Sequence, residues 1–237
     1  MADVLAIAAA SMAQDVARMT TISHNLANAL TPGFRREMAA ARPFIDHLGG
    51  AAAAALLQPA AAVLTDQRQA TLRATGAPLD LALEGEGFFE VQAPDGPAYT
   101  RHGEFHLDAG GRLVTSAGLA VMGQGGDIVL GSGRVRVDAQ GRVFEDDRPA
   151  GQLRLVRFEQ ASALRASGDG LFRADGVVPA PAADLRVRQG QLENSNVSTM
   201  TEMVRLIETM RHFEASQRLV QNVDDSLGRA IRTLGEF

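Results

Sequence analysis

The sequence contains no cysteine and no tryptophan, and it has a single tyrosine. Without cysteine the chain cannot form a disulfide, use a thiol nucleophile or bind a metal through thiolates, so functions that depend on thiol chemistry are excluded. Folding therefore does not depend on the redox state of the compartment. Cytoplasmic and exported locations both stay open.

An excess of positive charge is also missing. Lys and Arg together number 23 against 28 Asp and Glu, which gives a formal net charge of -5 and a pI near 5.5. Proteins that bind nucleic acid or anionic membranes usually carry a basic patch that supplies an attractive field. We therefore expect no nucleic-acid partner.

The N-terminus lacks the features of a secretory signal. Residues 1–16, MADVLAIAAASMAQDV, have no basic first segment and no small-residue cleavage site, and their apolar stretch is too short and too interrupted to span a bilayer. If the protein leaves the cell, we expect a specialised export route without a cleaved signal peptide.

The N-terminal segment predicts a long amphipathic helix over residues 3–30. Apolar side chains recur at intervals of four and three, and only Ser23 interrupts them. Thr31-Pro32-Gly33 predicts the end of the helix, because proline disfavours helical geometry in the preceding residue and glycine permits a reversal. The predicted seam is Leu5, Ala9, Met12, Val16, Met19, Leu26 and Leu30.

The C-terminal segment predicts a second long helix from about Ser198 onward. Its apolar residues follow one heptad register, with the polar residues Gln217 and Asp224 at two positions of that register. The two helices can pair with each other in a monomer or pack against neighbouring chains, and the pattern fits both arrangements. The predicted seam is Leu206, Met210, Phe213, Val220, Leu227, Ile231 and Leu234.

Between the helices, short β-type runs separated by glycine-containing turns predict an all-β body. Segments 105–113 and 135–143 share one pattern, in which an Asp opens a turn and a Gly three positions later takes positive φ. We therefore predict two hairpins in which Asp108 and Asp138 form the turns.

The segment that precedes this body has little bulk to bury. Residues 49–62 are rich in alanine and broken by Pro59, and residues 64–75 follow without a clear period. We predict an extended or poorly packed connection here, so that the β body begins near Leu79.

Candidate catalytic and ligand-binding residues do not form a recognised arrangement. His102 and His106 flank Glu104, but the His-Glu-x-x-His helix of zinc enzymes is absent and the segment has strand character. The glycine-rich segment 123–126 precedes Asp127 instead of the Lys-Ser/Thr pair of a phosphate-binding loop. We therefore predict no catalytic residue, no metal site and no cofactor, and we expect that the protein is not an enzyme.

Three blocks of the sequence resemble the bacterial flagellar rod and hook protein family, in the order that the family has them. The first, residues 22–34, contains Asn-Leu-Ala-Asn followed by Thr-Pro-Gly-Phe, with His24 at a position where the family usually has Asn. The second consists of residues 79–89 and 99–105, and the third of residues 190–197 with the helix after them. The resemblance covers both ends and the middle of the chain.

Residues 151–156 and 168–173 are more similar to the proximal-rod branch of the family than to its distal-rod branch. The resemblance implies a structural subunit of the basal-body rod that polymerises with other rod proteins and with copies of itself. It also implies export by the flagellar type III apparatus, a location in the rod beneath the outer membrane, and no small-molecule substrate. The alternative reading is a secreted or surface β-domain binding module with helical stalks.

The expected fold is mixed α and β, with long terminal amphipathic helices in a coiled-coil-like layer around a central all-β domain. The expected divisions are an N-terminal helix over 1–35, a connection over 36–78, a β domain over 79–188 and a C-terminal helix over 189–237. We expect the assembly interface to consist of the following residues of the two helices and the turn after the first: Leu5, Met12, Val16, Met19, Asn25, Leu26, Asn28, Thr31, Pro32, Gly33, Leu206, Met210, Phe213, Val220, Leu227, Ile231 and Leu234.

Overall fold

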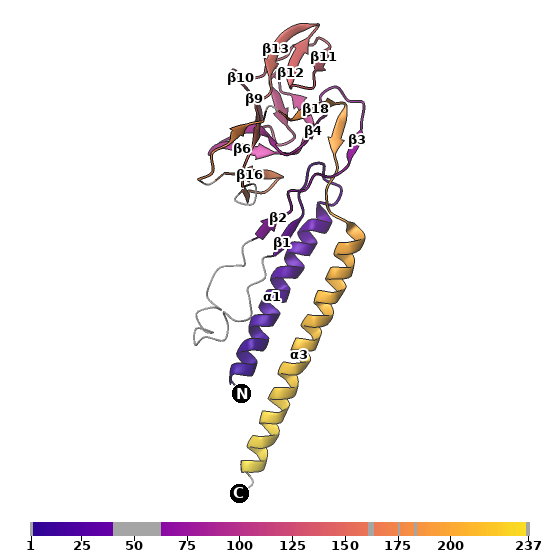
Figure 1. Ribbon diagram of the computed structural model, residues 1–237. Helices are drawn as coiled ribbons and strands as arrows, with labels where there is room; N and C mark the ends of the chain where they lie inside the picture. Colours follow the sequence, from indigo (N-terminus) through magenta and orange to yellow (C-terminus); the bar gives the residue numbers. More distant parts are fainter. Residues whose placement is uncertain (1, 40–62, 161–163, 175, 183, 236–237) are drawn as a thin grey trace. The chain divides into compact units, whose positions relative to one another are not determined.

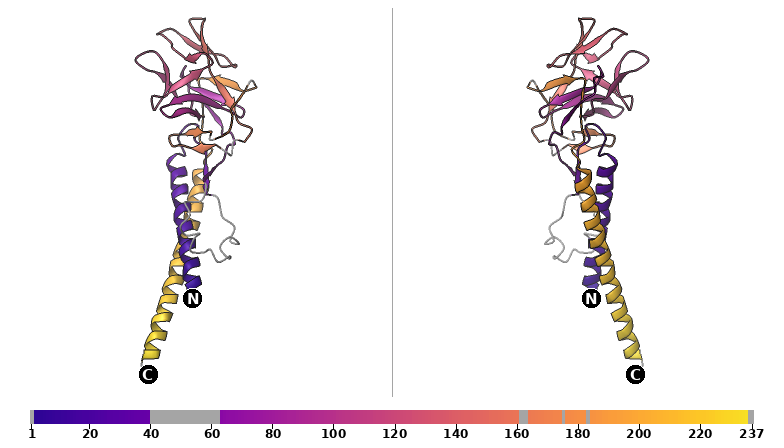
Figure 2. Two further views of the ribbon diagram at one scale, coloured as in Figure 1. Left: turned by 90° about the vertical axis from the view of Figure 1, so that its left-hand side faces the viewer. Right: turned by 90° about the vertical axis from the view of Figure 1, so that its right-hand side faces the viewer.

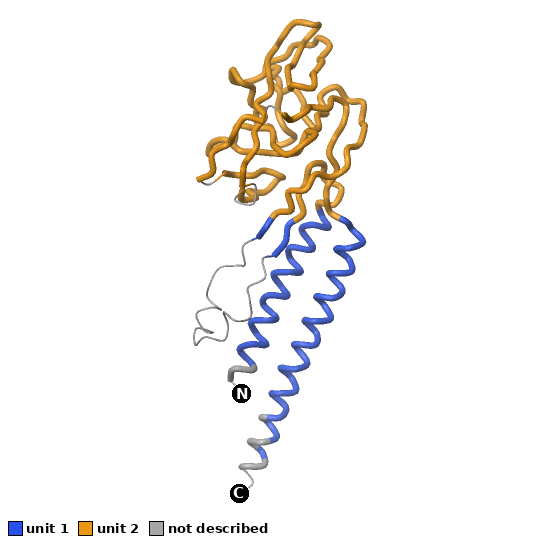
Figure 3. The backbone as a smooth tube through the Cα atoms, viewed as in Figure 1, with its two compact units in different colours: residues 1–27, 37–64, 198–237 blue, residues 28–36, 65–197 orange. Residues whose placement is uncertain are grey.

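A computed structural model describes residues 2–39, 63–160, 164–174, 176–182 and 184–235, without the side chains of 2–4, 227, 230, 231 and 233–235. The chain divides into two compact units, coloured separately in Figure 3. The helical unit contains residues 1–27, 37–64 and 198–237, and the β unit contains residues 28–36 and 65–197. The expected divisions at residues 35, 78 and 188 stay a prediction, and the alanine-rich stretch 49–62 lies outside the described residues.

The helical unit is built from two long antiparallel helices. Helix α1 spans Ala2–Ala27 and helix α3 spans Thr199–Gly235. They lie side by side in Figures 1 and 2, with Asp15 beside His212 and Asn25 beside Glu202. The short strands β1 (Glu37–Ala39) and β2 (Val63–Thr65) pair with each other in a separate two-stranded sheet.

Both helix ends have local chemical causes. Helix α1 ends at Ala27 and not at Leu30, because residues 28–31 form a turn in which the Thr31 amide donates to the Asn28 carbonyl at 3.1 Å. Helix α3 begins after Ser198, whose hydroxyl oxygen accepts a hydrogen bond from the Thr201 amide at 3.4 Å. The predicted start of the second helix is therefore confirmed, and the predicted end of the first lies too far along the chain.

The largest sheet of the β unit runs in the order β15-β16-β6-β5-β9-β8-β7, with β10 paired to β9, β14 to β5 and β17 to β14. Its strands are β5 (Phe88–Ala93), β6 (Gly96–Thr100), β7 (Phe105–Leu107), β8 (Leu113–Thr115), β9 (Ala120–Gly123), β10 (Gly126–Asp127), β14 (Leu155–Arg157), β15 (Arg165–Ala166), β16 (Leu171–Arg173) and β17 (Ala180–Pro181).

Three smaller sheets complete the β unit. Strands β11, β12 and β13 form a meander, β18 pairs with β4, and β19 pairs with β3, all antiparallel. Their bounds are β3 (Leu72–Ala74), β4 (Leu81–Glu84), β11 (Val135–Val137), β12 (Arg142–Glu145), β13 (Arg148–Gln152), β18 (Arg186–Gln189) and β19 (Gln191–Glu193).

An apolar core holds these sheets together. Phe89 and Val91 on β5 are fully buried, and the Phe89 ring packs edge-on against Phe105 with the ring centroids 5.1 Å apart. A second cluster gathers around Phe88, where Tyr99 and Phe158 pack with centroids 4.8 Å apart. Such edge-to-face pairs add to the stabilisation from buried area.

The two predicted hairpins are confirmed, and they are built alike. Gly111 and Gly141 take φ values of 77° and 76°, and each donates its amide to the carbonyl of the Asp that opens its turn. The Asp108 carboxylate accepts the Arg112 amide at 2.9 Å, and the Asp138 carboxylate accepts the Arg142 amide at 3.0 Å. The glycines are needed because the left-handed region is open to them without steric cost.

The mixed α and β fold class is thus confirmed, with one helix at each end of the described chain and a largely β central region. No helix in the described part of the chain is long and apolar enough to cross a membrane.

Candidate assembly surfaces

The inward face of α1 follows a heptad that only half matches the predicted seam. Leu5, Met12, Met19 and Leu26 are half-buried, as the prediction requires. The second position of each heptad differs from the prediction. Ala8, Asp15 and Ile22 are buried there, whereas the predicted Ala9 and Val16 are exposed. Leu30, the last residue of the predicted seam, is 94% exposed.

The buried face of helix α3 also matches the predicted seam only in part. Leu206, Phe213 and Val220 are half-buried as predicted, but the alternate position belongs to Glu202 and Thr209, which are buried, whereas Met210 is 47% exposed. The side chains of the remaining seam residues, Leu227, Ile231 and Leu234, lie outside the described residues.

Polar residues occupy the positions that the hydrophobic pattern misplaced, and each has a partner. The buried Asp15 carboxylate lies 2.5 Å from His212 Nδ1 on α3. Glu202 accepts a hydrogen bond from Arg205 at 2.9 Å, and Thr209 donates to the Arg205 carbonyl at 2.8 Å. A count of apolar residues cannot find such positions, because what allows a polar side chain to be buried is a partner elsewhere.

Asn25 fastens the end of α1 to β1. Its Nδ2 donates to the Glu37 carbonyl at 2.8 Å, while its Oδ1 accepts the Glu37 amide at 2.8 Å. The same Nδ2 lies 3.4 Å from the Glu202 carboxylate, and Asn25 is fully buried. Asn25 was expected to contact neighbouring chains, and the structure places it inside the helical unit.

A second apolar face runs along α3, away from the seam. Met200 is 79% exposed, and the other members of this face are each about half exposed. Their spacing of three or four residues places them on one side of the helix. We call this set the α3 stripe: Met200, Met203, Val204, Ile207 and Met210.

The turn after α1 has type II geometry. The Phe34 amide donates to the Thr31 carbonyl at 3.3 Å, and Gly33 takes a φ of 67° with Pro32 before it. Gly33 is distant in sequence from the β body, but a Cβ at this position would lie 2.5 Å from the carbonyl carbon and oxygen of Arg101. Asn28, Thr31 and Pro32 are half-buried.

Asn194 and Asn196, which precede α3, connect separate chain segments. Asn196 Oδ1 accepts the Arg36 amide at 2.6 Å, and its Nδ2 donates to the Asp66 carbonyl at 2.8 Å. Asn194 donates to the Thr71 hydroxyl at 3.0 Å. We call the assembly of residues 33–36, 66–71, 193–196 and Arg101 within the β unit the three-segment cluster.

Buried charges lie at the centre of this cluster. The Glu193 carboxylate accepts from Arg35 Nη1 at 2.7 Å and from Arg101 Nη1 at 3.3 Å. Burial lowers the pKa of the Arg101 guanidinium to about 10, although the Glu193 charge opposes that shift. Sequence analysis missed Arg35 and Arg101 because an arginine usually lies on the surface.

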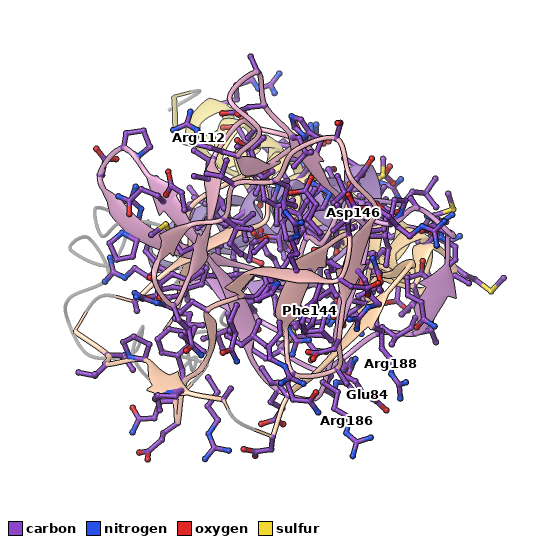
Figure 4. The ribbon with its side chains drawn as sticks, turned by 90° about the horizontal axis from the view of Figure 1, so that it is seen from above. Glu84, Arg112, Phe144, Asp146, Arg186 and Arg188 are labelled. Carbon is purple, nitrogen blue, oxygen red and sulfur yellow. The ribbon has the colours of Figure 1, made fainter. Side chains whose placement is uncertain are left out.

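The outer surface of the β unit carries exposed ion pairs and a contact between an arginine and an aromatic ring. Figure 4 shows Arg188 beside Glu84, with an Nη2 to Oε2 distance of 2.7 Å, and Arg186 is paired with Glu84 in the strand register. The Arg136 guanidinium stacks over the Phe144 ring at 4.2 Å. Such exposed pairs contribute little to stability and do not by themselves form a site.

Other labelled residues in Figure 4 have turn roles. Asp146, at the tip of the β12–β13 hairpin, takes a φ of 47° and accepts the Arg134 amide at 2.9 Å. Arg112 donates to the Asp108 carboxylate at 2.8 Å. Within the described residues no three His, Cys, Asp or Glu side chains are grouped to hold a metal ion.

Comparison with known proteins agrees with this arrangement. Residues 188–233 match the family described as flagellar basal body rod FlgEFG protein C-terminal, and residues 82–145 match the flagellar hook protein FlgE/F/G D1 domain. The chain is 34% identical over 225 residues to the flagellar basal-body rod protein FlgF of Caulobacter vibrioides, a match that covers 91% of each protein.

Two further relatives extend the comparison. The FlgF protein of Salmonella typhimurium is 34% identical over 239 residues, which cover 93% of this chain and 94% of the relative. The flagellar basal-body rod protein FlgG of Borreliella burgdorferi is 31% identical over 256 residues, which cover 94% of this chain and 95% of the relative. The chain belongs to the flagellar basal-body rod protein family.

Proposed function

We propose that this structural subunit of the basal-body rod joins other rod proteins, and copies of itself, through its two terminal helices. In the assembled rod these helices would pack with those of neighbouring subunits as a coiled-coil-like layer. The residues that we assign to the contact are those of the α3 stripe and the exposed Val16 of α1. The function requires no cofactor and no catalytic residue.

The α3 stripe is the observation that carries this proposal. Helix α3 already buries one face against α1, and the stripe gives it a second apolar face with helical spacing. A contiguous exposed apolar face on a folded protein usually marks a contact with another molecule. A stripe with this spacing suits another helix, which would insert its own side chains between these.

The composition of the stripe suits neighbours of more than one kind. Three of its five members are Met200, Met203 and Met210. Methionine is unbranched and polarisable, so it repacks against different surfaces at low cost. A subunit that meets both copies of itself and other rod proteins would need such a surface.

We place the subunit in the proximal part of the rod, in the periplasm beneath the outer membrane. The support for this position is the likeness of residues 151–156 and 168–173 to the proximal-rod branch, together with the FlgF relatives. We further propose that the flagellar type III apparatus exports the chain without a cleaved signal peptide.

The proposal is tested by placing a charge in the stripe. In cells that lack the native gene, Ile207→Asp should be exported at normal levels and should fold, but it should be absent from purified basal bodies, because a desolvated carboxylate would have no partner. The control is Val178→Asp, at an 84% exposed apolar position of the β unit. Normal incorporation of Ile207→Asp, or equal exclusion of both variants, would contradict the proposal.

A further inference from the structure

At the centre of the three-segment cluster two buried cations, Arg35 and Arg101, share one buried anion, Glu193. The side chains of Arg35 and Glu193 have no exposed surface, and that of Arg101 is 3% exposed. Arg35 lies 2.7 Å and Arg101 lies 3.3 Å from opposite oxygens of the same carboxylate. The group therefore carries one net positive charge in a water-poor environment, and removal of the carboxylate would leave two.

The two arginines depend on Glu193 to different degrees. Arg101 also donates to the carbonyls of Leu83 and Gly85, and its guanidinium lies 5.6 Å from the centre of the Phe88 ring. Leu83 and Phe88 lie in strands β4 and β5 of the β unit, and Gly85 directly follows β4.

Arg35 has a single further acceptor, the Arg68 carbonyl at 2.9 Å. Its Nε and Nη2 atoms find no hydrogen-bond partner among the described residues. Loss of the Glu193 charge would therefore leave Arg101 anchored by the sheets and would leave Arg35 with one neutral acceptor.

The backbone reinforces the link between the two ends of the chain. The Gly33 amide donates to the Glu193 carbonyl at 2.7 Å, and the Asn196 amide donates to the Phe34 carbonyl at 3.3 Å. The Glu193 carboxylate also accepts the Ala70 amide at 2.8 Å. Segment 33–36 is thus held mainly by residues 193–196.

We propose that the charge of Glu193 controls the docking of segment 33–36, so that the N-terminal part of the cluster docks only when β19 is in place. Breaking a buried ion pair by removing one partner is strongly destabilising, because the remaining charge is left uncompensated. Without the Glu193 charge, the state in which segment 33–36 has left the cluster would have a lower free energy than the state that buries two unneutralised guanidinium groups. The core of the β unit does not take part, because Arg101 keeps its sheet partners.

Hydrogen exchange in the full chain tests the proposal. In Glu193→Gln, which keeps the shape of the side chain, the amides of Gly33, Phe34 and Arg36 should exchange at least about tenfold faster, because a local opening becomes cheaper. The amides of Val91 and Val121 in β5 and β9 should keep their wild-type rates.

Charge balance supplies the decisive control. Arg35→Met removes the excess cation and leaves one arginine with one carboxylate, so the same amides should stay within about twofold of wild type. In the Arg35→Met/Glu193→Gln double variant, exchange should be slower than in Glu193→Gln alone, because only Arg101 remains charged and it keeps its carbonyl partners.

Four outcomes would overturn the inference. These are wild-type exchange in Glu193→Gln, equal damage from Arg35→Met and Glu193→Gln, absence of rescue in the double variant, and loss of protection at Val91 and Val121 together with Gly33. The last would mean that Glu193 supports the whole β unit and not the docking of one segment. None of these measurements depends on rod assembly.

Discussion

The two units of this protein differ in what fills their buried interior. The β unit has an apolar core in which Phe89 and Val91 are fully covered, although it also buries the charged group around Glu193 and exposes Val178. The helical unit buries the charged side chains of Asp15 and Glu202 in its seam and leaves apolar residues such as Ile207 half exposed. The helical unit thus combines a polar seam with the exposed α3 stripe, for which we propose a partner.

This difference has a thermodynamic consequence. Polar pairs in a helical seam contribute less than packed apolar groups, but they specify which residues face each other. Because Asp15 faces His212 and Asn25 faces Glu202, the antiparallel register of the helices is defined. We infer that the helical unit is specified by its seam and is stabilised further when the α3 stripe is covered.

The largest expected effect comes from truncating one apolar side chain in each unit and comparing the losses of stability. Phe89→Ala should lower the free energy of unfolding of the β unit by about 3–5 kcal/mol, because the cavity lies in a closed core. Ile207→Ala should change the stability of the monomer by less than about 0.5 kcal/mol, because its side chain is half exposed.

Tyr99 provides the measurement for the β unit. It is buried there, and the chain has no other tyrosine and no tryptophan, so intrinsic fluorescence reports on that unit alone. Circular dichroism at 222 nm reports on the helices. Similar losses from the two truncations would show that the α3 stripe is already covered in the monomer.

The next largest effect is expected at Gly33, in the turn after the first helix. Gly33→Ala should destabilise the β unit by about 2–4 kcal/mol, because positive φ and overlap with the Arg101 backbone add together. Gly118→Ala is the matched control, since Gly118 has a φ of 78° with open space around its Cβ position. Equal Tm shifts for the two variants would mean that the close approach of Gly33 to Arg101 has no energetic weight.

A smaller effect tests the polar seam. His212→Ala should cost the helical unit about 1–3 kcal/mol, because it leaves the buried Asp15 carboxylate without its imidazole partner. Asp15→Leu combined with His212→Leu should recover most of that loss, since the double change removes the buried carboxylate together with its partly exposed imidazole partner. Thermal melts at 222 nm measure both, and a double variant as unstable as His212→Ala would contradict this view of the seam.

The helices, the β body and the hairpins could be predicted from the sequence because local patterns determine them. Leu5, Met12, Met19 and Leu26 follow the heptad, and Gly33 follows a proline in a turn that requires positive φ. Several of the errors share one origin. They occur where a polar side chain is buried against a partner that is distant in sequence.

Asp15 illustrates this limit, since its partner lies on the other helix. A pattern search placed Val16 in the seam because it is apolar, although the structure leaves it 49% exposed. Arg35 and Glu193 were missed for the same reason, because neither residue has a local signal for burial. Asn196, whose side chain accepts the Arg36 amide, likewise has a partner that is distant in sequence.

The smallest expected effect lies in the turns of the β unit and depends on pH. Hydrogen bonds from the Arg112 backbone and side chain lower the pKa of Asp108. Burial raises the pKa of Asp138, but hydrogen bonds from Arg142 outweigh it and the net shift is also downward. A carboxylate with a lowered pKa in the folded state stabilises the fold above its unfolded pKa, and this contribution disappears as the pH falls through the folded value.

We therefore expect the Tm of the β unit to fall as the pH drops below about 4, the usual range for an aspartate, and to fall less in Asp108→Asn and Asp138→Asn. Both turns lie on the surface, so the change should amount to a few degrees at most. Asp169→Asn is the control, because Asp169 also lies in a turn of the β unit and no hydrogen bond to its carboxylate is found among the described residues. If Asp169→Asn reduces the acid sensitivity as much as the other two variants do, the hydrogen bonds to Asp108 and Asp138 are not its source. The acid sensitivity of the β unit would then come from its carboxylates in general, and it would no longer distinguish the two units.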